Sequence, residues 1–85
     1  MASTWHVYIV ECADGTLYSG ITTDLDRRIN EHNESDKGAK YTRAKRPVAL
    51  VYSEVHTDRS TASKREYELK QLSREKKDSL INKNL

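Results

Sequence analysis

The sequence predicts a small α+β domain with the element order ββαβαα. Three observations support this class: two β-rich runs flank an Asp-Gly turn, a third alternating run follows Pro47, and the remaining segments carry apolar residues at helical spacing. The 85 residues suffice for one compact domain, which we expect to span 1–85 without repeats or a linker. Hydrophobic residues make up 35% against 33% charged residues, so the core must be built from a few apolar stripes.

The first two strands are predicted to form a hairpin. Residues 4–12 and 16–21 are β-rich and flank an Ala-Asp-Gly turn. A two-residue Asp-Gly loop would leave Tyr8 and Tyr18 on opposite faces of the sheet, because successive side chains alternate. A three-residue loop with its glycine in a G1 bulge instead pairs Tyr8 with Gly20, which leaves room for a ligand, and places both phenols on one face. The turn permits both loops; we predict the bulged form, since only this form lets the two phenols share a site.

A helix is predicted over residues 24–32. Thr22 or Thr23 can cap it, and Leu25 and Ile29 lie on its buried stripe.

The polar residues of this helix separate into two groups. At about 100° per residue, Arg28 and His32 face the protein, whereas Arg27 and Glu31 point to solvent. An inward histidine is more often a packing residue than a catalyst, so position alone assigns His32 no chemistry.

The second half of the chain begins with a predicted strand. Pro47 opens it, and it covers residues 48–55, with Val48, Leu50 and Tyr52 on one face.

Two helices complete the predicted order. The first covers about 60–72, and Ser73 can cap the second. The expected inward residues of the two helices are Ala62, Leu69, Leu72, Leu80 and Ile81.

Glu66 lies on the inward stripe of the 60–72 helix, whereas Glu68 points elsewhere. Burial of an unpaired charge is costly, so Glu66 either pairs with a cation, with Arg28 as the expected partner, or holds a metal ion. Tyr52 is interpreted as a packing residue and Cys12 as a small apolar filler.

Cysteine usage and hydropathy favour a cytoplasmic protein with no membrane partner. The single cysteine, Cys12, cannot form an internal disulfide, and no paired cysteines suggest a zinc site. The N-terminus lacks the basic and apolar regions of a signal peptide, and no apolar run is long enough to span a bilayer.

A basic segment suggests a nucleic-acid partner. The net charge is only +2, but residues 37–46 carry five cations around one tyrosine and no acidic residue. The segment contains Lys37, Lys40, Tyr41, Arg43, Lys45 and Arg46. It is either a solvated loop or a phosphate-contacting surface in which the tyrosine stacks on a base. If all five cations met phosphates, a plot of log K against log salt for duplex DNA would have a slope of about −4.5.

The two halves of the hairpin carry the most informative motifs. His6-Val7-Tyr8 and Tyr18-Ser19-Gly20, followed by Arg28, His32 and Glu66, resemble the signature of the GIY-YIG nuclease superfamily. His6 stands where that signature has its first glycine.

Further segments are similar to the small stand-alone bacterial GIY-YIG proteins, an uncharacterised family whose relatives include an Slx-type catalytic domain. The similar segments are residues 38–43, 46–47 and 51–54. The resemblance covers nearly the whole chain.

The resemblance implies a GIY-YIG endonuclease fold, in which a three-stranded antiparallel sheet is flanked by helices. It also implies hydrolysis of a phosphodiester bond with one divalent metal ion, usually Mg²⁺, to give 5′-phosphate and 3′-hydroxyl ends. DNA is the expected substrate in preference to RNA, in a repair or recombination setting.

The resemblance further implies a role for each site residue. Tyr8 is the general base or helps to activate the water, assisted by His32 or the metal because a phenol has a reference pKa of about 10. Tyr18 hydrogen-bonds the phosphate or the water, Arg28 neutralises charge that develops in the transition state, and Glu66 holds the Mg²⁺.

Two other interpretations stay open. The chain is alternatively a catalytically inactive nucleic-acid-binding module with the same fold, or a protein-interaction domain in which Arg28 and Glu66 form a structural ion pair. Glu66→Gln should abolish cleavage by an enzyme but change only the stability of a binding module. Because no accessory DNA-binding module is recognised, a protein partner could supply specificity.

Overall fold

The computed structural model describes residues 4–34 and 44–83. Its elements are β1 (Trp5–Glu11), β2 (Leu17–Thr22), α1 (Leu25–Glu34), β3 (Ala49–His56), α3 (Arg59–Gln71) and α4 (Arg74–Lys83). The order is ββαβαα, as the sequence predicts. Among the described residues, no helix is long and apolar enough to cross a membrane.

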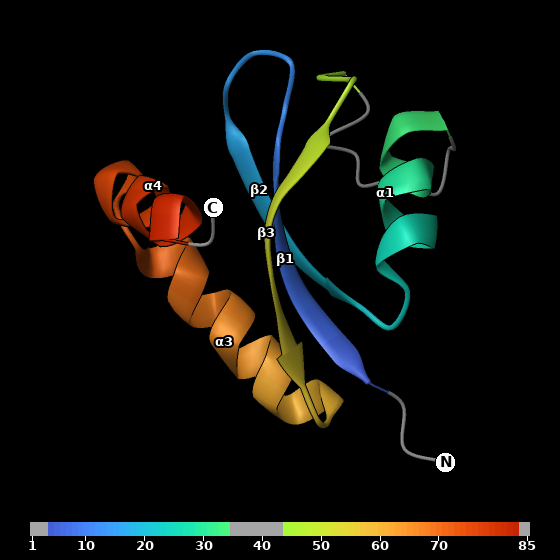
Figure 1. Cartoon of the computed structure of the whole chain (residues 1–85), viewed down its shortest axis with the longest axis vertical. Coiled ribbons are helices and arrows are strands. Elements are labelled where there is room, and N and C mark those ends of the chain that lie inside the picture. The colour runs from blue at the N-terminus through green and yellow to red at the C-terminus, as the bar shows by residue number, and fades with distance from the viewer. Residues whose placement is uncertain (1–3, 35–43, 84–85) are drawn as a thin grey trace.

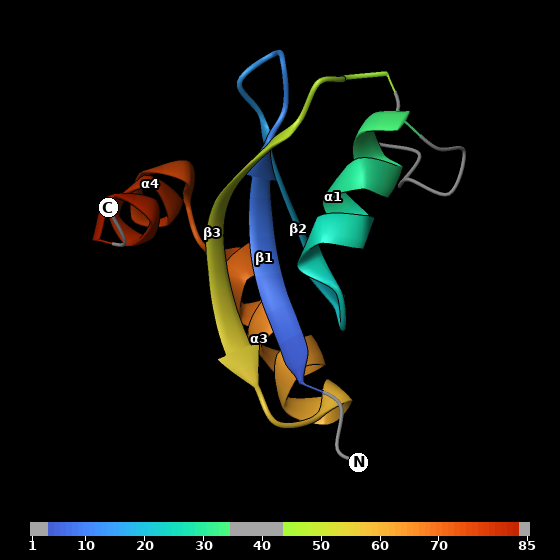
Figure 2. The same ribbon diagram turned by 45° about the vertical axis from the view of Figure 1, so that its right-hand side comes forward.

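The strands form one antiparallel sheet in the order β2-β1-β3, with α1 on one face and α3 and α4 on the other (Figure 1 and Figure 2). The central strand β1 therefore sends alternate side chains into two cores. The core on the α1 face contains Tyr8, Val10, Cys12 and Val48, packed by Tyr18, Leu25 and Ile29. The core on the other face contains Val7, Ile9, Tyr52, Ala62 and Leu69.

The hairpin adopts the bulged form that the sequence analysis predicted. Gly15 has a φ of 85°, a left-handed conformation that favours glycine. Its loop sets a register in which Tyr8 pairs with Gly20 and Val10 with Tyr18. Both phenols therefore lie on the face that α1 covers.

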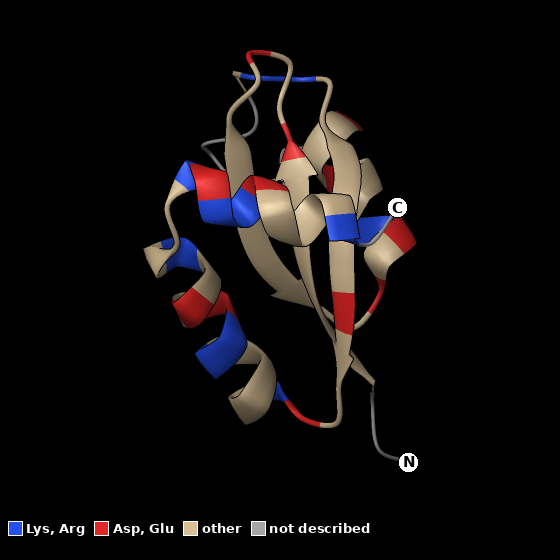
Figure 3. Cartoon of the chain, turned by 60° about the vertical axis from the view of Figure 1, so that its left-hand side comes forward, with Lys and Arg blue, Asp and Glu red and all other residues tan. Residues whose placement is uncertain are grey.

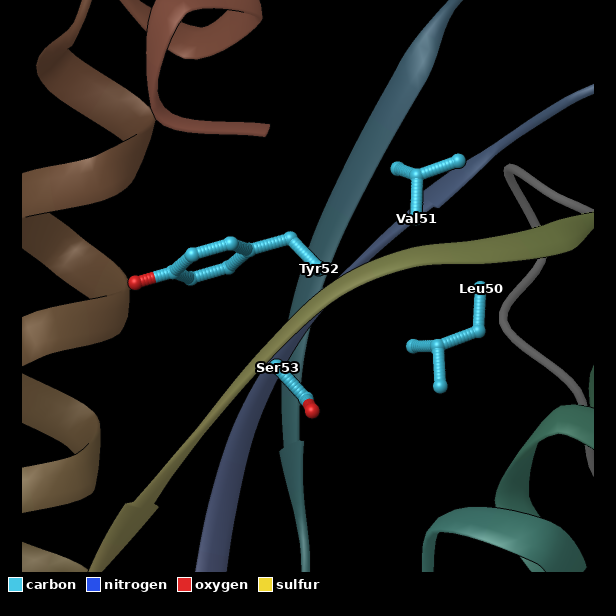
Figure 4. Close-up of a pocket in the computed structure, with 4 residues that line it drawn as sticks. All are labelled: Leu50, Val51, Tyr52 and Ser53. Carbon is cyan, nitrogen blue, oxygen red and sulfur yellow. The ribbon is translucent and has the colours of Figure 1, made fainter. Parts of the chain in front are cut away.

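Strand β3 departs from the predicted alternation. Consecutive residues of β1 pair with Tyr52 and Leu50, which leaves Val51 as the extra residue of a β-bulge. The prediction that Val48, Leu50 and Tyr52 share a face is wrong, because the bulge reverses the side of every later residue. Figure 4 shows Tyr52 pointing toward α3 and Leu50 pointing the opposite way, beside the shallow hollow that these residues line with Ser53.

Each described helix begins at a polar cap. Asp24 caps α1 by accepting a hydrogen bond from the N–H of Arg27 at 3.0 Å, so Thr22 and Thr23 are not the caps. The hydroxyl of Thr22 instead accepts from the N–H of Asp24 at 3.1 Å. Asp58 caps α3, and Ser73 caps α4 as predicted.

Polar contacts fix α3 against the edge strand. The Glu54 carboxylate of β3 accepts hydrogen bonds from the Tyr52 hydroxyl at 2.8 Å and from Nε of Arg65 at 2.6 Å. Figure 3 shows Lys and Arg interspersed with Asp and Glu along α3 and α4, so these helices present no surface of a single charge.

Candidate active site

A buried tyrosine and a buried histidine form the centre of the candidate site. Tyr8 of β1 is 1% exposed and His32 of α1 is 0% exposed. Their Oη and Nε2 atoms lie 2.8 Å apart, a hydrogen bond that joins the sheet to the helix. Tyr18 of β2 lies edge-on to the same imidazole, with ring centroids 5.5 Å apart. Tyr8, Tyr18 and His32 therefore lie at one site, as the sequence predicted.

Gly20 makes this arrangement possible. A Cβ atom at residue 20 would lie 2.6 Å from Cζ of Tyr8, closer than real side chains approach. The room that the sequence analysis assigned to a ligand is therefore taken by the phenol of Tyr8 itself.

Burial controls the protonation of the pair. Removal from water lowers the pKa of His32 to about 4, with the Arg28 charge adding to this effect, Glu31 opposing it and Arg46 reinforcing it. The imidazole is therefore neutral at neutral pH. Burial also raises the pKa of Tyr8 above its usual value of 10.0. A neutral phenol and a neutral imidazole therefore share this hydrogen bond.

Arg28 provides positive charge beside the phenol. Its hydrogen bond to Tyr8 opposes the effect of burial and lowers the pKa of the phenol. Nη1 of Arg28 also pairs with Oε1 of Glu31 at 3.0 Å, and both side chains are about one quarter exposed. The expectation that Glu31 points to solvent is wrong, because the long Arg28 side chain reaches the residue one turn further along the helix. Arg27 is exposed, as predicted.

Glu66 belongs to α3, which packs on the face of the sheet opposite to α1 (Figure 2), so the structure does not group it with Tyr8, Tyr18 and His32 under α1. The Glu66 side chain is 24% exposed, and its Oε1 lies 3.7 Å from Nζ of Lys70. The sequence analysis expected Glu66 to pair with Arg28. Among the described residues, Glu66 pairs with Lys70 and Arg28 pairs with Glu31 instead. The Glu66 charge raises the pKa of Tyr8 further, after the larger effects of burial and of Arg28 and Tyr18.

A metal ion at Glu66 would have the Glu66 carboxylate as its protein ligand. Within the described ranges, no three His, Cys, Asp or Glu side chains gather as a metal-binding group. Mg²⁺ keeps several waters and is commonly held by one or two carboxylates together with substrate phosphates. Glu66 fits that mode of binding, and it does not fit a site built from protein ligands alone.

The basic segment is only partly described. Lys37, Lys40, Tyr41 and Arg43 lie outside the described residues. Lys45 pairs with Oδ2 of Asp14 in the hairpin turn at 3.0 Å. Arg46 donates to the carbonyl oxygens of Glu31 and His32 near the end of α1. The two described cations therefore contact protein groups.

The sequence analysis missed the contacts that hold the last turn of α1. The side chain of Asn33 bonds both to the N–H and to the carbonyl oxygen of Val48. The local signal was weak, because an asparagine near a helix end has many alternative roles.

Comparison with known proteins gives a consistent family. The profile of the GIY-YIG catalytic domain matches residues 4–79. The UPF0213 protein DP2720 of Desulfotalea psychrophila is 66% identical over 77 residues, which cover 91% of this chain and 70% of that protein. The UPF0213 protein VNG_2274C of Halobacterium salinarum is 55% identical over 76 residues, covering 89% of this chain and 97% of that protein.

Two solved structures share the fold. The solution structure of the UPF0213 protein BH0048 from Bacillus halodurans is 49% identical, with a TM-score of 0.59, and the match covers 93% of this chain and 83% of that one. The solution structure of EF2693 from E. faecalis is 36% identical, with a TM-score of 0.62, and covers 99% and 92%. With the family profile spanning the sheet, the paired tyrosines and α3, the chain belongs to the GIY-YIG catalytic domain family.

Proposed function

We propose that this protein is a metal-dependent endonuclease that hydrolyses phosphodiester bonds of DNA, in preference to RNA, in the cytoplasm and in a repair or recombination setting. The observation that carries the proposal is the buried hydrogen bond between Tyr8 and His32, with Arg28 bonded to the same phenol. A buried phenol needs a hydrogen-bond partner in any case, but an imidazole and a guanidinium at one phenol oxygen are also groups that can take its proton and stabilise its anion.

Tyr8 and His32 act as a proton relay in this proposal. The water that attacks phosphorus gives a proton to the phenol oxygen of Tyr8, while the phenol passes its own proton to Nε2 of His32. The neutral imidazole is the form that can accept, and the pKa of about 4 keeps it neutral at physiological pH. A pKa of about 4 also makes this imidazole a weak base, so the proton transfer depends on the negative charge that the phosphate brings to the site.

Arg28 and Tyr18 act on the phosphate. The Arg28 guanidinium neutralises charge that grows on the phosphate oxygens in the transition state, and Glu31 holds that guanidinium in place before the substrate binds. Tyr18 provides a hydroxyl for the phosphate or the water. Glu66 would hold Mg²⁺, which when bound supplies stabilisation of the leaving oxygen. Cleavage of the bond between phosphorus and O3′ gives 5′-phosphate and 3′-hydroxyl ends.

The test is cleavage of a labelled panel of substrates with and without Mg²⁺. The panel contains single-stranded, duplex, flap and branched DNA, together with RNA. Glu66→Gln should abolish cutting and leave binding nearly unchanged. Glu68→Gln is the matched control, because Glu68 lies on the same helix but is 57% exposed and pairs with Arg65.

Metal-dependent cutting that Glu68→Gln retains and Glu66→Gln loses would establish the nuclease and its substrate class. Binding without cutting across the panel would favour an inactive nucleic-acid-binding module, or an enzyme that requires a protein partner. Cutting that survives in Glu66→Gln would refute the assignment of Glu66.

A further inference from the structure

We propose that Arg46 and Asn33 form a clamp on the last turn of α1 that positions His32 against Tyr8, and that Arg46 acts in this way rather than as a phosphate contact. The inference rests on the proposed function, because it gives these two side chains a role in the proposed proton relay. Both are positioning residues, since each acts through the helix that carries His32.

Arg46 holds two backbone oxygens near the C-terminal end of α1. Its Nε donates to the carbonyl oxygen of His32 at 2.5 Å, and its Nη2 donates to the carbonyl oxygen of Glu31 at 3.3 Å. A guanidinium at this position also complements the negative end of the helix dipole.

Asn33 attaches the same turn to Val48, the residue that precedes β3. Its Oδ1 accepts from the N–H of Val48 at 2.7 Å, and its Nδ2 donates to the carbonyl oxygen of Val48 at 3.1 Å. These two hydrogen bonds join residues that lie 15 positions apart in the sequence. Val48 belongs to the core that contains Tyr8, so the anchor reaches the same side of the sheet as the phenol.

His32 lies between the two attachments. Its own carbonyl is held by Arg46, and the next residue, Asn33, is held to Val48. Its imidazole is fully buried and bonded to Tyr8 at 2.8 Å. A rotation or a shift of this turn would move Nε2 away from the phenol, and a misplacement of about 1 Å can cost about 10²-fold in rate.

The direction of the Arg46 guanidinium separates positioning from phosphate binding. Sequence analysis placed Arg46 among the cations that meet nucleic acid. In the structure two of its nitrogens point to backbone oxygens of α1 in a part-buried setting. A phosphate contact predicts that loss of Arg46 weakens DNA binding, whereas the clamp predicts that it changes the environment of His32.

The experiment measures His32 in the protein alone and then measures DNA binding and cleavage. Proton–nitrogen correlation spectra of the imidazole, recorded against pH, report its tautomer and its pKa. The charged and titratable groups that face this imidazole are Tyr8, Tyr18, Arg28, Glu31 and Arg46. The first four are unchanged in every variant, so a shift in Asn33→Ala, which keeps every charge, is attributable to the clamp, whereas a shift in Arg46→Gln also contains the loss of the Arg46 charge.

Arg46→Gln should raise the pKa of His32, because the Arg46 charge lowers it, and should average its two tautomers. Asn33→Ala keeps every charge and should average the tautomers with a smaller change in pKa. Arg46→Lys keeps the positive charge and a donor group, so it should recover part of the wild-type spectrum. This variant replaces Arg46→Gln in the test if Arg46→Gln does not fold. Arg27→Gln, which removes an exposed cation from the same helix, should leave the His32 signals unchanged.

In the cleavage assay, Arg46→Gln should lower kcat by about 10²-fold while the Kd for duplex DNA and its salt slope stay at the wild-type values. Wild-type His32 signals in Arg46→Gln, with weaker binding and a salt slope reduced in magnitude by about 0.9, would overturn the clamp in favour of a phosphate contact. If the wild-type protein binds DNA but cuts no substrate, the result favours an inactive binding module or an enzyme that requires a partner, and the spectra still decide whether the clamp exists.

Discussion

Acidification through the titration of His32 should destabilise this protein over a pH range that begins above the pKa values of its carboxylates. The pKa of His32 is about 4 in the folded protein and 6.5 in the absence of the fold. The unfolded chain therefore binds the proton first, and stability that is fully present above pH 6.5 is lost as the pH falls toward 4. At about 1.4 kcal/mol per pKa unit, the loss is about 1.4 kcal/mol at pH 5.5 and about 2.5 kcal/mol at pH 4.5.

Such a loss is large for a domain of this size, whose total stability is expected to be only several kcal/mol. Urea unfolding at pH 7.0, 5.5 and 4.5 measures it directly. Carboxylates do not account for loss in this window. The pKa of Asp14 is lowered to about 2 by hydrogen bonds from Thr16 and by Lys45, so its contribution is lost only below about pH 4. Glu54 also has a lowered pKa, and its contribution is lost below its usual value of 4.5.

The control is His32→Gln, which keeps an amide near the Tyr8 hydroxyl but cannot titrate. Subtraction of its stability from that of the wild type at each pH removes the contribution of all other groups. The difference should fall by about 2.5 kcal/mol from pH 7.0 to 4.5. A difference that does not change with pH would refute the conclusion that the buried imidazole is held neutral, and with it the proton relay.

Three further substitutions test the packing around the site. Gly20→Ala should destabilise the fold by about 1–3 kcal/mol and raise the pKa of His32, because the new methyl group displaces the Tyr8 phenol. Gly15→Ala is its comparison: no atom lies within 4 Å of the new Cβ, so only the strain of the positive φ should appear, about 1 kcal/mol, with His32 unaffected. Glu54→Gln should lower stability by about 2 kcal/mol in urea unfolding at pH 7, because it removes the charge that Arg65 binds; an unchanged midpoint would contradict this.

The sequence predicted the element order and the shared face of the two phenols, because both depend on local turn chemistry and on the two-residue period of a strand. The left-handed Gly15 is such a local feature. The sequence did not predict the bulge at Val51, since an unbroken apolar run fits a strand in either register. The prediction that Glu31 points to solvent was made from its rotation around the helix axis. It was wrong because that angle gives the direction of the Cβ atom and does not show how far the Arg28 side chain reaches. The clamp by Arg46 was inaccessible because its partners lie 14 and 15 residues away.

The ion pairs and hydrogen bonds of Arg28, Lys45 and Arg46 reduce the number of phosphate contacts expected in a complex with DNA. Burial keeps His32 uncharged, so Arg28 is the site cation, and its charge is partly balanced by Glu31.

The basic segment is the densest source of positive charge for a phosphate backbone, with five cations within residues 37–46. Lys45 and Arg46 already hold the hairpin turn and α1, which leaves Lys37, Lys40 and Arg43 as the candidate contacts. Three phosphate contacts correspond to a salt slope of about −2.7 for duplex DNA, against about −4.5 for the whole segment. Binding measured by fluorescence anisotropy from 50 to 200 mM salt distinguishes these values. A slope near −4.5 would mean that Lys45 and Arg46 exchange their protein partners for phosphate when DNA binds, which would remove the clamp from the bound state.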